Sequence, residues 1–182
     1  MSSLRSPGRS RLARAAVLIA VPLAFAAAAF AQEAPAGLEG TWLLHTPRSR
    51  AQAVIDEGIQ EAVDSMGPLR RAIGRRRLRA KNRLLGTVVV AREGERIAVT
   101  LEDWTGTTRA GRFETVTLDD GEEVQLQQTL TETRLVQVFR GEDGQRRNVL
   151  TLRPDGRAVL AVTVTSDQLP DPLRYRVIYR RR

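Results

Sequence analysis

Cysteine is absent from this chain of 182 residues, and histidine occurs once. Without cysteine there can be no disulfide framework, no thiolate metal site, no cysteine nucleophile and no lipid attached at a cysteine behind an export signal. A single histidine, His45, excludes a metal site or a catalytic pair built from several histidines. His45 follows a predicted strand, where a surface position is the ordinary role. The lack of cysteine therefore excludes thiol chemistry, and the single histidine excludes sites built from several histidines.

Motifs of common enzymes are also missing. The serines Ser49, Ser65 and Ser166 lack the Gly-x-Ser-x-Gly context of a hydrolase nucleophile. The sequence contains neither a phosphate-binding loop nor a dinucleotide-binding fingerprint. The acidic pairs Asp119-Asp120 and Glu122-Glu123 have the composition of a hairpin turn. We therefore expect no enzyme, and we assign no catalytic residue, cofactor or metal site.

The N-terminal segment up to Ala31 has the layout of a secretory signal peptide. A head with arginines and no acid precedes an uncharged apolar run from Ala15 to Phe30, and Ala29-Phe30-Ala31 places small residues where a signal peptidase reads. We expect cleavage after Ala31 and export to the periplasm or outside the cell. The alternative is an uncleaved N-terminal membrane anchor, although the run is shorter than the ~20 residues of a spanning helix. Loss of the head's arginines would halve the net charge of +8.

The remainder, about 150 residues, is long enough for one domain with a buried core. Residues 32–37 (QEAPAG) are expected to be a flexible leader, and residues 38–182 a single domain. Leu38–His45 is a short apolar stretch that contains threonine and tryptophan, which predicts a strand. Residues 47–83 are then a predicted helical insertion.

Two helices are predicted in this insertion. Thr46 is the expected N-cap of the first helix, with Pro47 at its first position. Apolar residues recur at helical spacing from Val54 to Met66, and this stripe would cover the open side of a barrel. Gly67-Pro68 ends the first helix and starts the second. The expected apolar face of the second helix leaves out Leu78 and consists of Leu69, Ala72, Ile73, Ala80 and Leu84.

The second predicted helix is the strongest charged feature, since its basic residues have no acid among them. One interpretation is contact with an anionic surface of the cell envelope, either lipid or polymer. The other is a solvated helix face that pairs with acids on neighbouring strands. The basic residues are Arg70, Arg71, Arg75, Arg76, Arg77, Arg79, Lys81 and Arg83.

In the rest of the chain the apolar period changes to that of strands. Asp, Gly and Pro at the joints, such as Asp119-Asp120-Gly121 and Pro154-Asp155-Gly156, predict tight hairpins. The pattern gives about eight short strands in an antiparallel up-and-down meander. Such a meander would curl into a barrel or half-barrel to protect its edges, so the fold class is mainly β. In the last strand, Tyr175 and Tyr179 alternate inward with outward arginines.

Two other classes are excluded. An outer-membrane barrel would place Arg134, Arg147, Arg174 and Arg176 against lipid, at about 2–4 kcal/mol each in mid-membrane. The two Trp, two Tyr and four Phe are too few for its aromatic girdles. Nucleic acid is a poor partner for an exported protein, and aromatic residues that could stack on bases are scarce.

Gly40-Thr41-Trp42 on the first predicted strand, followed by an up-and-down meander, resembles the lipocalin-like (calycin) β-barrel superfamily. The segment Leu150–Arg181 also resembles the ends of secreted bacterial proteins of this general shape. The resemblance implies a tryptophan that plugs one end of the barrel and stacks against a basic residue near the end of the last strand, Arg176 or Arg180. The chain departs from the family pattern because two helical segments follow the first strand, where lipocalins usually have a loop.

These observations predict an exported, soluble protein of the cell envelope that is a non-catalytic binding or structural module and holds a small apolar ligand between sheet and helices. The alternative is an envelope interaction protein that uses residues 70–83 on anionic lipid or polymer surfaces. Trp104, at a strand end or loop, is either a mouth residue of a cavity or a lid on the core. The candidates for a ligand cavity or barrel plug are Trp42, Trp104, Tyr175, Tyr179 and Arg176.

Overall fold

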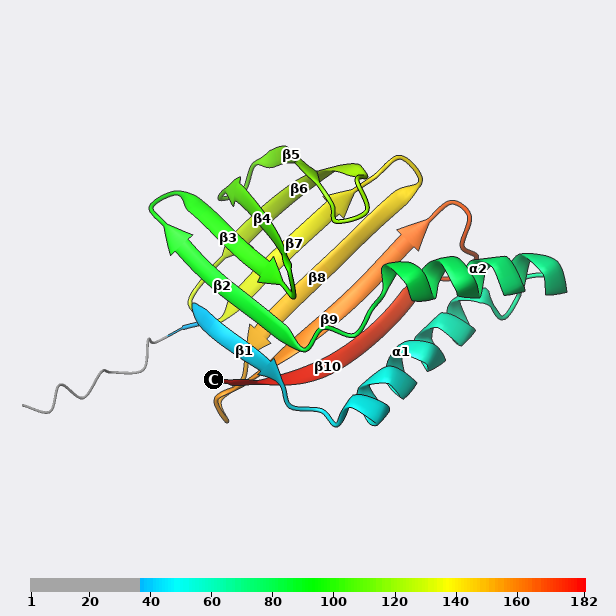
Figure 1. Cartoon of the computed structure of the whole chain (residues 1–182), viewed down its shortest axis with the longest axis horizontal. Helices are drawn as coiled ribbons and strands as arrows, with labels where there is room; N and C mark the ends of the chain where they lie inside the picture. The colour runs from blue at the N-terminus through cyan, green and yellow to red at the C-terminus, as the bar shows by residue number, and fades with distance from the viewer. Residues whose placement is uncertain (1–36) are drawn as a thin grey trace, which may run out of the picture. The chain divides into compact units, whose positions relative to one another are not determined.

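Ten antiparallel strands and two helices form the part of the chain that the computed structural model describes, residues 37–182 (Figure 1). The predicted signal peptide lies outside these residues. β1 (Gly40–Leu44) leads into α1 (Arg48–Val63) and α2 (Pro68–Lys81). The meander that follows consists of β2 (Thr87–Glu93), β3 (Arg96–Leu101), β4 (Trp104–Arg109), β5 (Phe113–Thr117), β6 (Glu123–Leu130), β7 (Arg134–Arg140), β8 (Gly144–Leu152), β9 (Arg157–Ser166) and β10 (Leu173–Arg181).

The strands lie in the order β4-β3-β2-β1-β10-β9-β8-β7-β6-β5, so β1 pairs with both β2 and β10. The edge strands β4 and β5 follow each other in the chain, and β4 also approaches β6. A single bridge joins Ala110 to Gln128, and the Gly111 N–H donates to the Gln128 carbonyl oxygen at 2.7 Å. The sheet is therefore a nearly closed barrel.

The predicted antiparallel meander is confirmed, but the sheet has ten strands where the sequence predicts about eight. The unexpected strand is β4, which begins at Trp104. The two-residue turn Glu102-Asp103 joins β3 to β4, because Leu101 pairs directly with Trp104. Glu102 has a φ of 55°, a conformation that hairpin turns usually give to Gly, Asn or Asp. Without a glycine at this joint, the sequence has no clear signal for the hairpin.

The two helices begin differently from each other. Pro68 occupies the first turn of α2, as predicted. α1 begins at Arg48, one residue later than predicted, and no side chain caps it. The predicted N-cap, Thr46, instead accepts the Ile178 N–H at its Oγ1, at 3.0 Å. A tertiary contact with β10 has replaced the local cap.

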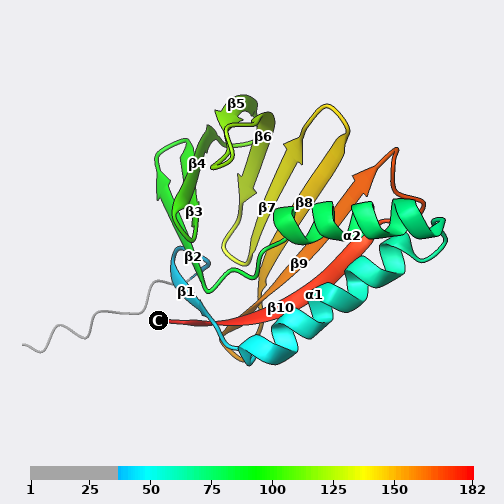
Figure 2. The ribbon, with the colours of Figure 1, turned by 45° about the vertical axis from the view of Figure 1, so that its right-hand side comes forward.

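α1 lies alongside β10 (Figure 2). Its apolar stripe packs into the core cluster of the barrel, as predicted. Gly58 permits the close approach, since a Cβ at this position would lie 2.4 Å from the Arg174 carbonyl oxygen. No side chain larger than hydrogen fits there without a shift of the helix or the strand. The buried residues of α1 are Ala51, Ile55, Gly58, Ile59, Ala62 and Val63.

The predicted apolar face of α2 is wrong. Leu78, which the prediction leaves out, is the one buried residue of this helix. Leu69 and Ile73 are 75% and 49% exposed, and Ala72 and Ala80 on the same face are exposed too. The reason is that α2 packs chiefly against α1, so the side that carries Leu78 is covered and the apolar side faces outward.

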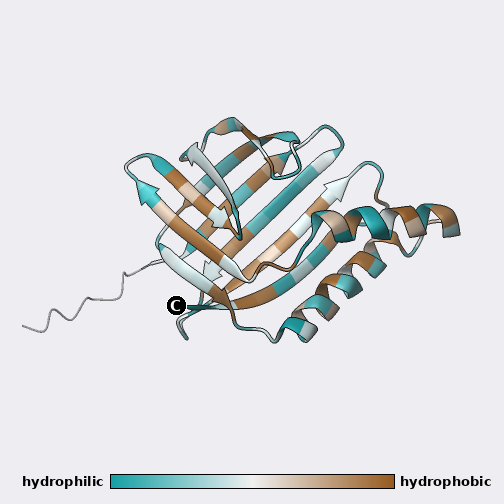
Figure 3. Ribbon diagram, in the orientation of Figure 1, coloured by the Kyte–Doolittle hydropathy of each residue, from teal (hydrophilic) through white to brown (hydrophobic). Residues whose placement is uncertain are grey.

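The barrel interior is apolar at two places. The larger cluster joins α1 and Leu78 of α2 to inward residues of β1–β3 and β6–β10, and it includes Trp42. The smaller cluster consists of Val124, Leu126 and Phe139, with Trp104 at its margin. Apolar and polar positions alternate along several strands (Figure 3). Among residues 37–182, no helix has the length and apolar content needed to cross a membrane.

Candidate functional site

A row of polar side chains crosses the inside of the barrel between the two apolar clusters. Gln128 of β6 lies opposite Gln137 of β7, which in turn lies opposite Asn148 of β8. Their exposed fractions are 0%, 1% and 1%. Alternation along the strands turns all three inward, because the residues two positions away, such as Leu126 and Leu150, are also buried.

The members of this polar row are linked by hydrogen bonds. Gln137 Nε2 donates to Gln128 Oε1 at 2.9 Å, and Asn148 Nδ2 donates to Gln137 Oε1 at 3.3 Å. Arg146 Nε donates to Asn148 Oδ1 at 2.9 Å. Buried amides destabilise a fold unless they are bonded in this way. The row is therefore one connected network from β6 to β8.

At its other end the polar row reaches the opposite wall of the barrel. Gln128 Nε2 donates to the carbonyl oxygens of Ile97 at 2.9 Å and Gly106 at 3.1 Å. It also lies 3.3 Å from Thr108 Oγ1. One amide thus ties β6 to β3 and β4 across the gap between the two edges of the sheet.

Arg146 ends the row below the C-terminus of α2. Its Nη1 donates to the Lys81 carbonyl oxygen at 2.9 Å and to Asn82 Oδ1 at 3.2 Å, and its Nη2 donates to the Tyr175 hydroxyl at 3.3 Å. Every acceptor is a neutral oxygen. Among residues 37–182, no carboxylate oxygen lies within 4.0 Å of this guanidinium. Four of its five N–H groups donate to these neutral oxygens, and one has no acceptor among the described residues.

The end of α2 is fastened to the β5–β6 turn above Arg146. Lys81 Nζ donates to Asp120 and, at 2.5 Å, to Glu122. Hydrogen bonding to Asp120, and next to Glu122, raises the pKa of Lys81. Hydrogen bonding to Lys81 lowers the pKa of Asp120. With Leu78 its one buried residue, α2 is held at this end largely by polar contacts.

A basic residue near the end of the last strand does stack on the buried Trp42. The Arg181 guanidinium lies 4.8 Å from the centroid of the Trp42 ring, within the range of a cation–π contact. Trp42 Nε1 donates to the Leu38 carbonyl oxygen at 2.8 Å. Arg181 Nη1 donates to the Glu39 carbonyl oxygen at 2.9 Å.

Arg181 takes the place that the resemblance assigned to Arg176 or Arg180. The register sets Trp42 opposite Arg181, and alternation turns Arg176 and Arg180 to the outer face, where both are exposed. Arg176 therefore belongs to no interior site. Because no hairpin joins β1 to β10, the sequence could not give their register. The inward alternation that ends at Tyr179 would have reached Arg181 one step later.

The two tyrosines of β10 are buried in the same cluster as Trp42. The Tyr175 hydroxyl faces Arg146. The Tyr179 hydroxyl donates to the Leu85 carbonyl oxygen at 2.8 Å, and burial raises the pKa of Tyr179 well above its ordinary range. Of the two, Tyr175 is the one in contact with the polar row.

Trp104 lies apart from Trp42, in the smaller cluster. Its ring centroid is 5.8 Å from that of Phe139. Its Nε1 donates to the Thr117 carbonyl oxygen at 2.8 Å, which links β4 to β5. This placement matches a lid on the small cluster better than a mouth residue shared with Trp42.

The basic run of α2 is divided between inward contacts and solvent. Lys81 is fastened to the β5–β6 turn, and Arg79 Nε pairs with Asp56 at 2.8 Å. Arg75 donates to Gln60 at 3.2 Å, and Arg71 to the Met66 carbonyl oxygen at 3.0 Å. The remaining four make no side-chain hydrogen bond or ion pair within residues 37–182: Arg70, Arg76, Arg77 and Arg83.

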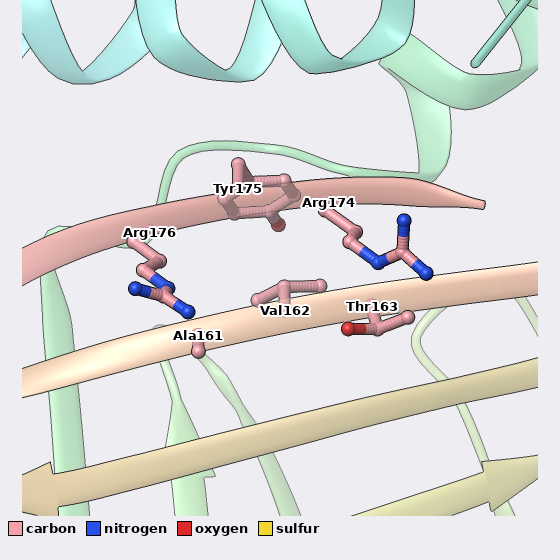
Figure 4. A pocket seen from close by; sticks show the side chains of 6 residues that line it. All are labelled: Ala161, Val162, Thr163, Arg174, Tyr175 and Arg176. Atoms are coloured by element: carbon pink, nitrogen blue, oxygen red, sulfur yellow. The ribbon is translucent and has the colours of Figure 1, made fainter.

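Two depressions of the described residues lie on the outer face of the sheet. One, of about 310 Å³, is lined by Ala161, Val162 and Thr163 of β9 and by Arg174, Tyr175 and Arg176 of β10 (Figure 4). The other, of about 400 Å³, lies over β5–β7 beside Arg140. His45 is exposed, and no cluster of three metal-ligating side chains occurs among residues 37–182.

The sequence analysis does not predict the polar row, although the sequence contains a signal for it. Gln128 stands between Leu126 and Leu130 at inward positions of its strand, and Gln137 stands between Leu135 and Phe139. A polar residue at an inward position marks a buried amide that needs a partner. Only the register between the strands shows that Gln128 and Gln137 are hydrogen-bond partners of each other.

No protein-family model and no curated protein matches the sequence. Among solved structures, the chain is similar to the "REP1-NXSQ fatty acid transporter", with 16% identity over 79% of this chain and 95% of that one, and a TM-score of 0.49. It is similar to the fluorescent protein UnaG, with 17% identity over 80% and 97% and a TM-score of 0.49. Human cRBP IV has 19% identity over 81% and 100%, with a TM-score of 0.47.

The chain resembles the lipocalin-like barrels in its architecture. It has an up-and-down antiparallel meander that nearly closes, a Gly-x-Trp motif on the first strand, and a basic residue of the last strand on the Trp42 ring. The two helices after β1 stand where the sequence predicted an insertion.

Proposed function

We propose that this protein is a non-catalytic binding protein that takes up a small, mostly apolar molecule carrying an anionic group. The observation that supports this is Arg146, a partly buried guanidinium whose acceptors are all neutral oxygens. A charge in such a position is stabilised by an anion that hydrogen-bonds to it. Tyr175 stands beside Arg146 as a second polar contact.

The apolar part of the ligand would lie against the larger core cluster, below α2. Two depressions of the described residues lie on the outside, and in this proposal α2 moves to admit the ligand to the interior. α2 is suited to this, because it buries only Leu78 and its end is fastened by Lys81 and Arg146. Elements with few buried contacts open at low free-energy cost.

The test uses ligands that differ in their head group alone. Hexadecanoate and hexadecanol are titrated into the wild-type protein, Arg146→Gln and Arg147→Gln, the last being the outward neighbour on the same strand. We expect the carboxylate to bind more tightly than the alcohol, and Arg146→Gln to weaken carboxylate binding about tenfold without affecting the alcohol. Equal loss in Arg147→Gln, or no binding of either ligand to the wild type, would refute the proposal.

Export is part of the same proposal. The segment up to Ala31 is the signal peptide, residues 32–37 are a leader, and residues 38–182 are the single domain that works in the periplasm or outside the cell. N-terminal sequencing of the protein from cell fractions tests this. A mature chain that starts at Gln32 supports the proposal, and a chain that starts at Met1 in the membrane fraction supports the anchor.

A second candidate function is docking on anionic lipid through α2. The observation in its favour is that Leu69 and Ile73 face outward, 75% and 49% exposed. Arg76 and Arg77 lie beside them and form no ion pair within the described residues. A helix with an outward apolar stripe and flanking arginines is typical of interfacial binding. Basic residues near an anionic membrane each contribute about 1 kcal/mol.

Binding to phosphatidylglycerol and phosphatidylcholine vesicles tests the docking function. We expect salt-sensitive binding to the anionic vesicles alone, weakened by Leu69→Ser with Ile73→Ser and by Arg76→Ser with Arg77→Ser. Arg112→Ser, an exposed loop arginine, is the control and should bind as the wild type does. If the wild type does not bind anionic vesicles at low salt, the candidate is wrong.

A further inference from the structure

The outer face of β8, β9 and β10 carries arginine and no acid. The sequences of these three strands contain neither Asp nor Glu. On the outward side, Arg147 lies opposite Thr163, and Thr163 lies opposite Arg174. Arg176 follows two residues along β10, and toward the other end of the same face Arg157 pairs with Arg180. Like charges placed side by side destabilise a sheet, so a structural role does not account for them.

These arginines are not used by the fold. Within residues 37–182, the side chains of Arg147, Arg174 and Arg176 form no ion pair and no hydrogen bond, in contrast to Arg79 of α2 and Arg146 of the interior. Arg174 and Arg176 are exposed. Their guanidinium groups therefore keep their full donor capacity for a partner outside the chain.

A shallow groove runs between the two exposed arginines. It has a volume of about 310 Å³, and Ala161 and Thr163 form its floor while Arg174 and Arg176 project beside it (Figure 4). Small residues on the floor let a chain-like ligand lie close to the sheet. Residues two apart on a strand are about 6.8 Å from each other and strands are about 4.8 Å apart, so the cations are spaced for repeated anionic groups.

The chemistry of this face selects among polyanions. Its outward positions hold no aromatic side chain, since Tyr175 and Tyr179 point inward, and single-stranded nucleic acid binding usually needs aromatic stacking. The exposed large apolar residues of the described chain, Leu69 and Ile73, are on α2 and not on this face. This face therefore offers no exposed large apolar side chain that could insert into a bilayer.

We infer that the outer face of β8–β10 binds a linear acidic polysaccharide, with Arg174 and Arg176 as its principal contacts and Arg147 as an extension across β9. The site is separate from the interior site at Arg146 and from the outward stripe of α2. Guanidinium groups bind carboxylate and sulfate bidentately, so uronic acids and sulfated sugars share the recognition chemistry.

The experiment measures binding of alginate oligomers and heparin fragments to the full protein over a range of salt concentrations. The test variant is Arg174→Ser with Arg176→Ser. The control is Arg70→Ser with Arg77→Ser, which removes the same charge from α2. We expect the test variant to bind about tenfold more weakly and its salt slope to fall by about 2, while the control stays within about twofold of the wild type.

Three results would overturn the inference. They are absence of binding by the wild type at low salt, an equal loss in the α2 control, and binding of single-stranded DNA as tight as that of the polysaccharides. Because the substituted arginines are exposed, the variants should melt as the wild type does. Ala161→Glu is a second variant that places a carboxylate on the groove floor, and it should weaken binding without removing an arginine.

Discussion

Single residues decide how closely the parts of this barrel approach one another. Gly58 allows α1 to touch the backbone of β10, and Gln128 joins β6 to β3 and β4. Both act between elements that are far apart in sequence. The sequence does not mark either residue as important, because a glycine in a helix and a glutamine in a strand are both common.

Gly58→Ala should lower the free energy of unfolding by about 1–3 kcal/mol. The added Cβ would lie 2.4 Å from the Arg174 carbonyl oxygen, and backbone cannot move aside as a side-chain tip can. The expected loss is the net change, after the gain in helix propensity of about 1 kcal/mol that alanine brings. Urea unfolding measures it, with Gly67→Ala as control, since no atom lies within 4 Å of a Cβ at Gly67. A Gly58→Ala variant as stable as the wild type would contradict the packing.

Among the elements, α2 is the one least committed to the core. Leu69 and Ile73 face outward, Leu78 is its one buried residue, and its C-terminal end is held by Lys81. The sequence predicts its bounds well, because Gly67-Pro68 starts the helix. It could not predict which face is buried, because that depends on where α1 lies.

The stability contributed by the contact between Lys81 at the end of α2 and Asp120 should depend on pH. The pKa of Asp120 is lowered by Lys81, so its contribution to stability is present above its ordinary value of 3.8 and is lost as the pH falls through the lowered pKa. The pKa of Lys81 is raised, so its contribution is present below 10.5 and is lost as the pH rises through the raised pKa.

Carbon-13 NMR of the Asp120 carboxyl group measures this effect. Lys81→Met should return the pKa of Asp120 toward 3.8, whereas Asp119→Asn should leave the lowered pKa in place. High salt should weaken the contact, because both side chains are largely exposed. If the titration of Asp120 were unchanged in Lys81→Met, the contact would not exist in solution.

At the scale of the whole molecule, the local sequence pattern predicts the class of fold. The register between strands that are distant along the chain determines which residues meet in the candidate site. Alternation and turn residues give the antiparallel meander, and Val54–Met66 gives the face of α1. The partner of Trp42 and the polar row depend on which residues lie opposite each other in strands distant along the chain. That information is absent from a single sequence, and this is why the family resemblance points to Arg176 or Arg180 where Arg181 stands.

The pairing of β1 with β10 also makes the two ends of the domain interdependent. Deleting residues 179–182 would remove the partners of Trp42, Leu43 and Leu44 together with the Arg181 guanidinium over the indole. We expect a red-shifted tryptophan emission and loss of a cooperative urea transition. Deleting Arg182 alone is the control, because it keeps the residue pairs of β1 with β10 and removes one backbone hydrogen bond, from the Arg182 N–H to the Thr41 carbonyl oxygen. A truncated protein that unfolds as sharply as the wild type would show that β1 does not need β10.

The Gln128 bridge between the two walls has a consequence for solubility. β4 and β5 end the sheet, and strand edges that are open to solvent template the addition of strands from other molecules. In this barrel the two edges turn toward each other, and the Gln128 amide and carbonyl hold β6 to β3, β4 and Gly111. We therefore expect Gln128, which also completes the buried hydrogen-bond network, to reduce aggregation by strand addition at the edges of the sheet.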